Sequence, residues 1–435
     1  MTAPLHVLIA TLGSAGDIHP FLALGQALQA RGHRVTVLCP EVFGPLVQQA
    51  GLGFGAMGST AQYEAVTQEP DLWDARKGFG VIWRHLREGL RLLPDHVQAL
   101  PPDEPLLLVC HPLALASADL CRTQRPGLPI VGAYLAPQNL RTVHHPLTLG
   151  PLAVPAWVPM AWRRWAWRRI DQQLIDPLTV PDLNALRRER GLPPIAHFVA
   201  HLQAVPDLTA TLFAPWFGPA QPDWPQPRVE GGFLLYDRPG QAVLSPELQR
   251  FLAAGPPPLV FTPGTGHRHA AGYFRAALQA VQALGRRAVF LTGHPEQLPA
   301  ALPPEVLAQA YASFRSLLPQ AAALVHHGGI GSTAEALRAG VPQLVVPFAH
   351  DQFDNARRVR ALGVGDALPA GHASPARLRR RLQALLDRPD LAAHCATLAA
   401  QAAADRPLPR LCDAIEALAR VQPGEARLKC GGEAS

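Results

Sequence analysis

Residues 326–356, HHGGIGSTAEALRAGVPQLVVPFAHDQFDNA, decide the fold of the second half of this chain. An apolar run that predicts a buried strand leads into the paired histidines and glycines, and a helical pattern follows the glycine-rich turn. We expect the helix to begin near Ser332 or Thr333, because serine and threonine hydroxyls are common N-caps. The apolar run QLVVPF then predicts a second strand, which ends just before Asp351 and Gln352. Strand, turn, helix and strand in this order are typical of a parallel sheet covered by helices.

The same alternation of apolar strands and helical patterns runs through both halves of the chain. Between the halves, residues 220–240 are crowded with proline and glycine and carry little periodicity, which predicts a connection there. The further strand-like runs are HVLIATLG (6–13), HRVTVLCP (33–40), PLLLVC (105–110), PPLVFTPGTG (257–266) and RRAVFLTG (286–293).

Length and composition agree with two domains. At ~100–200 residues per domain, 435 residues correspond to two domains, and 48% hydrophobic with 17% charged residues indicates a globular chain. We therefore expect an α/β protein with domains at residues 1–220 and 240–400. A helical segment at residues 401–425 is expected to pack back on the first domain.

Charge and cysteine usage narrow the class of protein. The formal net charge of +6 favours phosphorylated small molecules over nucleic acid, because no recognised nucleic-acid-binding motif accompanies it. The six cysteines are scattered without a C-x-x-C spacing, so we interpret them as reduced thiols in a cytoplasmic protein. The N-terminal MTAPLHVLIATLG lacks a basic leader, and we expect no signal peptide. No apolar run approaches the ~20 residues of a membrane-spanning helix.

The glycine-rich turn and the Asp-Gln pair suggest what this protein binds. Backbone N–H groups at a helix start attract anions, and glycines let a phosphate approach the backbone. Considered alone, the turn would equally fit an ordinary capped helix. However, Asp351 and Gln352 follow a strand end at the edge where open α/β sheets bind ligands. A carboxylate beside an amide there suits the hydroxyls of a sugar.

Two stretches carry a family resemblance. HHGGIGSTAEALRAGVPQLVVPFAHDQ resembles the nucleotide-sugar signature of the UDP-glycosyltransferase superfamily, and residues 13–37, GSAGDIHPFLALGQALQARGHRVTV, resemble its N-terminal start. The resemblance implies the GT-B fold, in which two Rossmann-like domains face each other across a cleft. It also implies that the acceptor binds the first domain and the sugar nucleotide the second. More narrowly, DLWDARKGFGVIW (71–83) and AHDQFDNA (349–356) resemble the rhamnosyltransferases of rhamnolipid synthesis.

The resemblance also implies a donor site. In the family pattern, His327 and Thr265 contact the diphosphate, Glu335 reaches the ribose and Tyr311 stacks on the base. The implied donor-binding residues are Thr265, Tyr311, His327, Gly328, Gly329, Gly331, Ser332, Glu335, Asp351 and Gln352.

Catalysis requires a base near the acceptor hydroxyl. Plant members of the superfamily have a histidine at the position of Asp17, and bacterial antibiotic- and sterol-modifying members have aspartate, so the resemblance implies Asp17 as the base. Burial can raise the low pKa of an aspartate toward this task. Alternatively, Asp17 caps a helix beginning near Pro20. His19 is a second candidate base with a suitable pKa. His111, after the strand LLLVC, is expected at the acceptor.

The segment PAWVPMAWRRWAWRRIDQQ, residues 155–173, interleaves tryptophan with arginine. It predicts either an amphipathic helix that contacts the inner membrane peripherally or a lid over an apolar acceptor pocket, with ordinary packing as a third interpretation. At 100° per residue Trp162 and Trp165 share a face, and Trp167 points elsewhere. We expect Trp162 and Trp165 to contact the acceptor.

Eighteen histidines invite a metal-site hypothesis, but no H-E-x-x-H or Cys-His spacing supports it, and we expect no metal and no cofactor besides the donor. The sequence thus predicts an inverting glycosyltransferase that moves L-rhamnose from dTDP-L-rhamnose to a hydroxyl of an apolar acceptor such as a hydroxy-fatty-acid dimer. The alternative is a UDP-glucose-dependent glucosyltransferase of a polyketide, phenol, flavonoid or sterol. A sugar-nucleotide epimerase and a non-catalytic accessory subunit are further alternatives.

Overall fold

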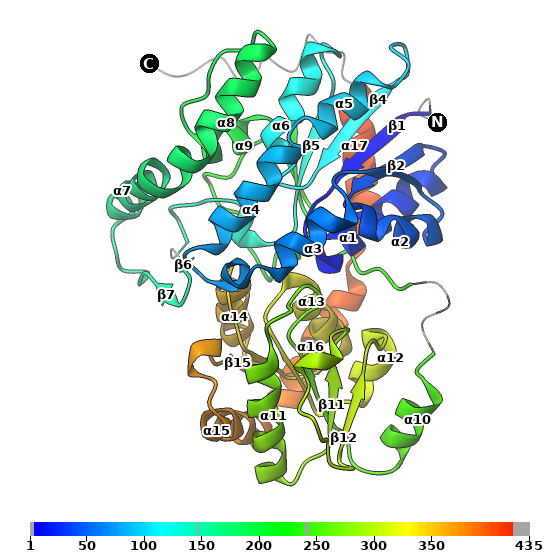
Figure 1. Cartoon of the computed structure of the whole chain (residues 1–435), viewed down its shortest axis with the longest axis vertical. Coiled ribbons are helices and arrows are strands. Elements are labelled where there is room, and N and C mark those ends of the chain that lie inside the picture. Colours follow the sequence, from blue (N-terminus) through cyan, green and yellow to red (C-terminus); the bar gives the residue numbers. More distant parts are fainter. Residues whose placement is uncertain (1–3, 146–147, 239, 241–242, 421–435) are drawn as a thin grey trace.

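The computed structural model describes residues 4–145, 148–238, 240 and 243–420, which form two α/β halves stacked one above the other (Figure 1). Within these residues the N-terminal half holds a sheet of seven parallel strands in the order β3-β2-β1-β4-β5-β8-β9. Its strands are β1 His6–Ala10, β2 Arg34–Cys39, β3 Gly53–Ala56, β4 Leu106–Cys110, β5 Ile130–Tyr134, β8 Leu208–Thr211 and β9 Arg228–Glu230.

The C-terminal half holds six parallel strands, among the described residues, in the order β12-β11-β10-β13-β14-β15. In both sheets the strand order reverses beside the first strand, between β1 and β4 and between β10 and β13, which is where α/β sheets bind ligands. The strands are β10 Leu259–Thr262, β11 Ala288–Leu291, β12 Val306–Gln309, β13 Ala323–His326, β14 Gln343–Val345 and β15 Gly365–Ala367.

Helices follow the strands as the alternating pattern predicts. Those of the N-terminal half are α1 Ala15–Ala30, α2 Gly44–Gln49, α3 Thr60–Gln68, α4 Gly78–Leu86, α5 Leu92–Gln98, α6 Leu115–Ala118, α7 Met160–Ile170, α8 Asp176–Glu189 and α9 Phe198–Ala204. Those of the C-terminal half are α10 Pro246–Ala253, α11 Ala271–Leu284, α12 Phe314–Leu317, α13 Ile330–Ala339, α14 Gln352–Ala361, α15 Pro375–Leu386, α16 Leu391–Ala404 and α17 Pro407–Arg420. A short hairpin joins β6 Thr148–Leu149 to β7 Leu152–Ala153.

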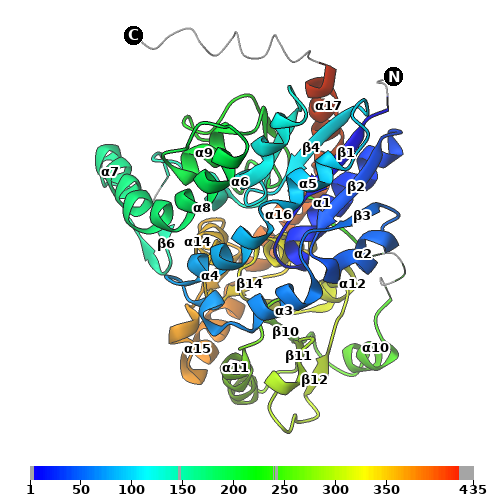
Figure 2. The ribbon, with the colours of Figure 1, turned by 45° about the horizontal axis from the view of Figure 1, so that its top comes forward.

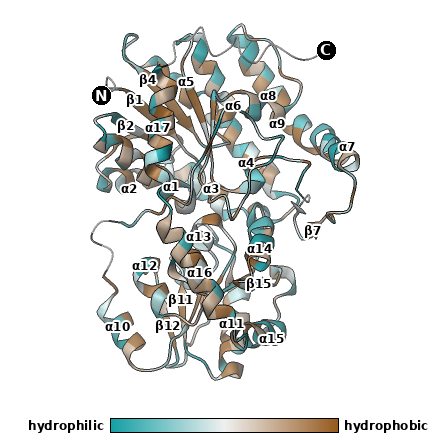
Figure 3. Cartoon of the chain, turned by 180° about the vertical axis from the view of Figure 1, so that it is seen from behind, coloured by the Kyte–Doolittle hydropathy of each residue, from teal (hydrophilic) through white to brown (hydrophobic). Residues whose placement is uncertain are grey.

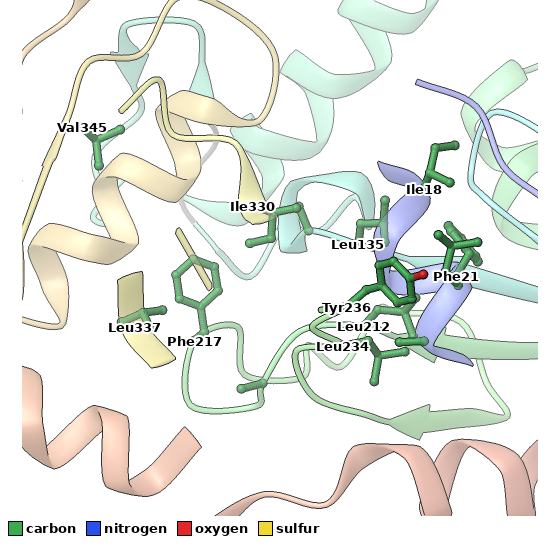
Figure 4. Close-up of a cluster of buried hydrophobic side chains, with 14 of the residues drawn as sticks. Ile18, Phe21, Leu135, Leu212, Phe217, Leu234, Tyr236, Ile330, Leu337 and Val345 are labelled. Atoms are coloured by element: carbon green, nitrogen blue, oxygen red, sulfur yellow. The ribbon is translucent and has the colours of Figure 1, made fainter. Parts of the chain in front are cut away.

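Buried apolar strands form the core of each half. Every residue of β1 and of β4 is buried, because helices cover both faces of a parallel sheet. The hydrophobic colouring of Figure 3 accordingly follows the strands of the upper sheet. Leu234 and Tyr236, from the connection between the halves, are buried in the same cluster as Phe21 and Leu212 (Figure 4). The connection is therefore a packed part of the core.

The boundary between the halves lies later than expected. Strand β9 pairs with β8, so the N-terminal sheet extends to Glu230 and the limit of residue 220 is wrong. The strand was missed because it has only three residues, RVE, inside a proline- and glycine-rich stretch where no alternation can be recognised.

The chain returns to its first half at the C-terminus. Helix α16 packs on α13, and α17 then packs on α1, β8 and β9. Figures 1 and 2 show α17 beside the blue N-terminal strands. Arg31, the C-cap of α1, pairs with Asp413 at 2.6 Å, and the Nε2 of His33 lies 3.2 Å from Glu416. Residues 421–425 of the expected helical segment lie outside the described residues, as does Cys430. The other five cysteines are free and buried.

Candidate functional site

A cleft of about 1520 Å³ lies between the halves and is lined by both. Pockets for single small ligands have ~300–1,000 Å³, so this volume suits two substrates together. The turns after β1 and β13 and the loop after β14 all line it. Among the described residues no group of three or more histidine, cysteine or acidic side chains could hold a metal ion. None of the described helices is long and apolar enough to cross a membrane.

Two helix N-termini face each other in the cleft. A Cβ placed on Gly331, in the first turn of α13, would lie 3.7 Å from the Cα of Gly16 in the first turn of α1. The expected helix start near Ser332 or Thr333 is wrong, because α13 begins at Ile330 and its N-cap is Gly329. The Thr333 hydroxyl instead donates to the Gly329 carbonyl one turn back, at 3.0 Å.

This earlier start places Gly331 and Ser332 inside the first turn of α13, where backbone N–H groups have no helical partner. Both residues line the cleft with Gly329. Gly328 is not among the lining residues, and its expected donor contact stays a prediction. Its Cβ position faces Val345, and its carbonyl accepts a hydrogen bond from Asn355 Nδ2 at 2.9 Å. Gly328 therefore lies on the side of the turn that faces away from the cleft, and its φ of +94° is a backbone conformation that glycine adopts readily.

His327 is held between two glycines. A Cβ on Gly264 would come within 2.6 Å of its imidazole, and one on Gly329 within 2.4 Å. Burial lowers the pKa of His327 to about 4, so the ring is neutral near pH 7. Its Nδ1 is buried and has no hydrogen-bond partner among the described residues. Thr265 lines the cleft just after Gly264. The two predicted diphosphate contacts thus lie on one side of the cleft.

The predicted nucleobase and ribose residues lie among charged side chains. Tyr311 is 46% exposed, and the guanidinium of Arg238 lies 5.0 Å from the centre of its ring. Glu335 accepts a hydrogen bond from Arg338 at 2.5 Å. Burial raises the pKa of Glu335 to about 7, and the charge of Arg338 opposes this shift. Glu335 faces the cleft, but one of its oxygens is already occupied.

Arg238 was missed by sequence reasoning. It comes from the connection between the halves, where a lone arginine among prolines and glycines gives no signal. It lines the cleft, and its Nε is buried without a partner among the described residues.

Asp351 and Gln352 lie at the start of α14, beyond the carboxyl end of β14. Asp351 accepts a hydrogen bond from Asn355 Nδ2 at 2.8 Å, and the same nitrogen donates to the Gly328 carbonyl, so Asn355 joins this loop to the glycine-rich turn. Gln352 Oε1 accepts from the backbone N–H groups of Phe348 and Ala349, at 2.8 and 3.1 Å. Its amide nitrogen forms no hydrogen bond with another described residue, and Gln352 lines the cleft. Asn355 was also missed, although its place four residues after Asp351 on a helix was a usable signal.

Two carboxylates, Asp17 from one half and Asp351 from the other, line the cleft. Burial, and next the charge of Asp17, raises the pKa of Asp351 to about 7. Burial also raises the pKa of Asp17, and hydrogen bonds from Ser14 oppose this shift. Because the two groups belong to different halves, a substrate between them meets one carboxylate from each.

Asp17 is not the N-cap of a helix beginning near Pro20. Helix α1 begins at Ala15 and includes Pro20, and Ser14 is its N-cap. Asp17 Oδ2 accepts hydrogen bonds from the Ser14 backbone N–H at 2.7 Å and from its hydroxyl at 3.1 Å. This capping box satisfies one carboxylate oxygen and aims the side chain at the cleft, where Asp17 is a lining residue.

His19 and His111 line the same part of the cleft. Burial, and next the charge of Arg238, lowers the pKa of His19 to about 4, and its Nε2 has no partner among the described residues. Burial lowers the pKa of His111 to about 3. The lowered pKa makes each imidazole a weaker proton acceptor, whereas burial raises the pKa of Asp17, so the carboxylate is the stronger candidate base.

The N-terminal side of the cleft has apolar walls. Trp162 and Trp165 are 63% and 53% exposed and are not among the residues that line it, so their expected acceptor contact stays a prediction. Trp167 lines it instead, with its Nε1 donating to the Thr142 carbonyl at 3.1 Å. The inward face of α7 is set by residues 163, 167 and 170, a helical spacing that the sequence could not orient. Other apolar lining residues are Phe79, Ile82, Leu86, Leu174, Phe198 and Leu202.

Trp73, another residue missed by sequence reasoning, reaches across the cleft. It belongs to the DLWDARKGFGVIW stretch, and its indole stacks on His267 of the C-terminal half at 4.6 Å with an interplanar angle of 2°. The His350 ring lies 5.8 Å away, edge-on. Residues 71–83, the DLWDARKGFGVIW stretch, therefore close one side of the cleft.

Comparisons with known proteins match both halves. Residues 7–95 match the glycosyltransferase family 28 N-terminal domain, and residues 278–418 match the C-terminal domain of the erythromycin biosynthesis protein CIII-like family. O-mycaminosyltylonolide 6-deoxyallosyltransferase of Streptomyces fradiae is 32% identical over 447 residues, covering 95% of this chain and 97% of that protein. Vancomycin aglycone glucosyltransferase of Amycolatopsis orientalis is 28% identical, covering 83% and 86%.

Solved structures share the fold. The glycotransferase of kitacinnamycin superposes with a TM-score of 0.73 at 22% identity, covering 96% of this chain and 99% of that one. A spinosyn rhamnosyltransferase complexed with thymidine diphosphate gives 0.64 at 19% identity, covering 95% and 100%. The predicted GT-B fold is thereby confirmed. The chain belongs to the GT-B glycosyltransferases that join a family 28 N-terminal domain to a C-terminal domain of the erythromycin biosynthesis protein CIII-like type.

Proposed function

We propose that this enzyme transfers L-rhamnose from dTDP-L-rhamnose to a hydroxyl of a large apolar acceptor, with inversion at the anomeric carbon. The observation that carries the proposal is that a single cleft is lined by the N-terminus of α13 and His327, by apolar side chains of the N-terminal half and by Asp17. The names of several relatives and neighbours support a 6-deoxysugar, including a 6-deoxyallosyltransferase and a spinosyn rhamnosyltransferase.

In the proposed mechanism, ionised Asp17 accepts the proton of the acceptor hydroxyl as the oxygen attacks the anomeric carbon. The bond from that carbon to the diphosphate breaks in the same displacement, so the configuration inverts. The negative charge that develops on the leaving diphosphate is stabilised by the backbone N–H groups of the first turn of α13, with His327 and Thr265. No metal ion takes part in this scheme.

The sugar is held between the two halves. Asp351 and the Gln352 amide nitrogen hydrogen-bond ring hydroxyls, and Trp73 with His267 encloses the same region. A 6-deoxysugar presents a methyl group where glucose presents a hydroxymethyl, and an aromatic wall tolerates the methyl. Buried polar partners left unpaired would discriminate against a donor with differently arranged hydroxyls.

Two acceptor classes fit the apolar walls. A hydroxy-fatty-acid dimer follows from the resemblance of residues 71–83 and 349–356 to rhamnolipid enzymes. A polyketide aglycone is favoured by the name of the tylonolide-modifying relative, which is 32% identical over nearly the whole chain. Both classes bring a hydroxyl on a large apolar body, and the chemistry at Asp17 is the same for either.

The test is a matrix of two donors and two acceptors. Purified enzyme receives dTDP-L-rhamnose or UDP-glucose with a hydroxy-fatty-acid dimer or a macrolide aglycone, and nucleoside diphosphate release and product mass are followed. We expect release only with acceptor and a higher kcat/KM for dTDP-L-rhamnose. Faster transfer of glucose would replace the rhamnosyl proposal by the glucosyltransferase alternative. Activity with the macrolide alone would identify the polyketide class, and release without any acceptor would contradict transfer as the main reaction.

A further inference from the structure

Exposed apolar side chains gather on one segment of the N-terminal half. Of ten large hydrophobic residues exposed among the described residues, seven lie between Leu152 and Leu178. Trp157 is the most exposed of them, at 81%. Contiguous exposed apolar surface on a soluble domain usually marks an interaction site. We call this the α7 surface: Leu152, Trp157, Met160, Trp162, Trp165, Leu174 and Leu178, with Arg164, Arg168 and Arg169.

The inner face of α7 is anchored. Arg163 is buried and donates to the carbonyls of Val143 and Ala156, and Trp167 donates to Thr142. The rings of Trp162 and Trp165 lie edge to face on the other side, 5.7 Å apart. Figures 1 and 2 show α7 at the outer edge of the N-terminal half. The tryptophans are thus presented outward by a helix that is already packed.

The α7 surface is also basic. Arg164, Arg168 and Arg169 are exposed, and none of them forms an ion pair with a described residue. The nearby carboxylates of Asp171 and Asp176 pair with Arg141 and His197 and not with these arginines. Unpaired arginines between exposed tryptophans suit the interface of an anionic bilayer, where indole rings lie at headgroup level and arginines meet lipid phosphates.

The surface is continuous with the acceptor side of the cleft. Leu152, Leu174 and Leu178 are exposed and line the cleft at the same time. An apolar wall therefore runs from the cleft onto the outside of the molecule. We propose that the α7 surface docks on an anionic lipid bilayer and places the mouth of the acceptor cleft at the lipid headgroups. Lipid binding is a property of this surface alone, whereas delivery of the acceptor from the bilayer rests on the proposed function.

The binding test needs neither donor nor acceptor. Full-length protein is sedimented with vesicles of phosphatidylcholine alone or of phosphatidylcholine mixed with phosphatidylglycerol. We expect partition to the anionic vesicles to exceed partition to the neutral ones. Combined Arg164→Ser, Arg168→Ser and Arg169→Ser should weaken it by about fivefold per arginine. Combined Trp157→Ser, Trp162→Ser and Trp165→Ser should weaken binding to both kinds of vesicle.

A matched control comes from α15, which carries exposed arginines but no exposed large apolar side chain. Arg377→Ser, Arg379→Ser and Arg380→Ser remove the same charge, and we expect partition to stay within about twofold of wild type, since phosphate-headgroup attraction is local. An equal loss in this control would overturn the proposal in favour of net charge. Equal binding of wild type to neutral and anionic vesicles would also overturn it.

Two further measurements distinguish lipid binding from self-association of the chain and from failure of the proposed function. A wild-type dimer in light scattering that dissociates in the tryptophan variant, with no vesicle binding, would make the surface an interface between copies of the chain and end the lipid proposal. Transfer to an acceptor dispersed in detergent should be unchanged in the arginine variant, which also checks that it folds. If wild type binds vesicles but transfers nothing, the proposed function fails and the lipid surface stands.

Discussion

Asp17→Asn tests the proposed base with little disturbance of the fold. In the wild type, Asp17 Oδ2 accepts two hydrogen bonds from Ser14, at 2.7 and 3.1 Å. An asparagine oxygen can accept both, so the capping box of α1 is kept. The amide then replaces a carboxylate that burial makes costly to ionise, and we expect the melting temperature to be equal or higher.

The rate should respond very differently from the stability. An amide cannot accept the acceptor proton, and loss of a general base typically costs ~10²–10⁴ in rate, or about 3–5.5 kcal/mol in the barrier. The affinity for free dTDP should stay within about threefold, because the proposed diphosphate contacts lie on α13 and at His327. Steady-state assays of nucleoside diphosphate release would give kcat, and calorimetry would give the affinity for dTDP.

A second variant, Ser14→Ala, distinguishes loss of the proposed base from loss of a side chain that positions it. Ser14→Ala removes the 3.1 Å hydrogen bond but leaves the carboxylate and the backbone bond, so we expect less than about tenfold loss of rate. If Asp17→Asn loses less than tenfold, Asp17 is not the base and His19→Ala becomes the next variant to test. If both Asp17→Asn and Ser14→Ala abolish dTDP binding, the residue acts by shaping the cleft.

Four further outcomes are expected. His327→Ala should weaken dTDP binding by about 1.5–3 kcal/mol in calorimetry, since it removes a positioned donor to a charged oxygen, and unchanged affinity would refute this contact. Gly264→Ala should lower dTDP affinity by displacing the imidazole that lies within 2.6 Å of its Cβ position, whereas Gly285→Ala, which has a positive φ of 59° as Gly264 has one of 94° but meets nothing within 4 Å and does not line the cleft, should not. Asp351→Asn should melt higher than wild type at pH 8, and this advantage should shrink as pH falls below about 7 and vanish near the ordinary aspartate pKa of 3.8. Burial raises the pKa of Asp351 to about 7, so between these two pH values the folded wild type keeps a proton that the unfolded chain loses, and its stability falls as pH rises to about 7 and stays level above it; an advantage independent of pH in scanning calorimetry would contradict the buried ionisation. Trp167→Ala should raise the KM for acceptor and leave the KM for donor unchanged, and the reverse pattern in steady-state kinetics would place the acceptor elsewhere.

Much of the fold and the position of the glycine-rich turn could be predicted from the sequence. The fold follows from buried apolar runs at regular intervals, because the central strands of a covered parallel sheet, such as β1 and β4, are buried on both faces. The glycine-rich turn is local as well, since its glycines and the helix start lie within a few residues of one another. A local pattern of this kind can be recognised without knowing the rest of the molecule, even though α13 begins at Ile330, two to three residues before Ser332 and Thr333.

Only the tertiary structure decided what crosses the cleft. The stack of Trp73 on His267 and the approach of Arg238 to Tyr311 join residues separated by about 194 and 73 positions, and no periodicity specifies such pairs. The same holds for α7, whose spacing grouped Trp162 with Trp165 but could not say which face meets the protein. Hydrophobic periodicity defines faces of helices and strands. Which face meets which partner depends on how the two halves pack together, and that is a property of the whole folded chain.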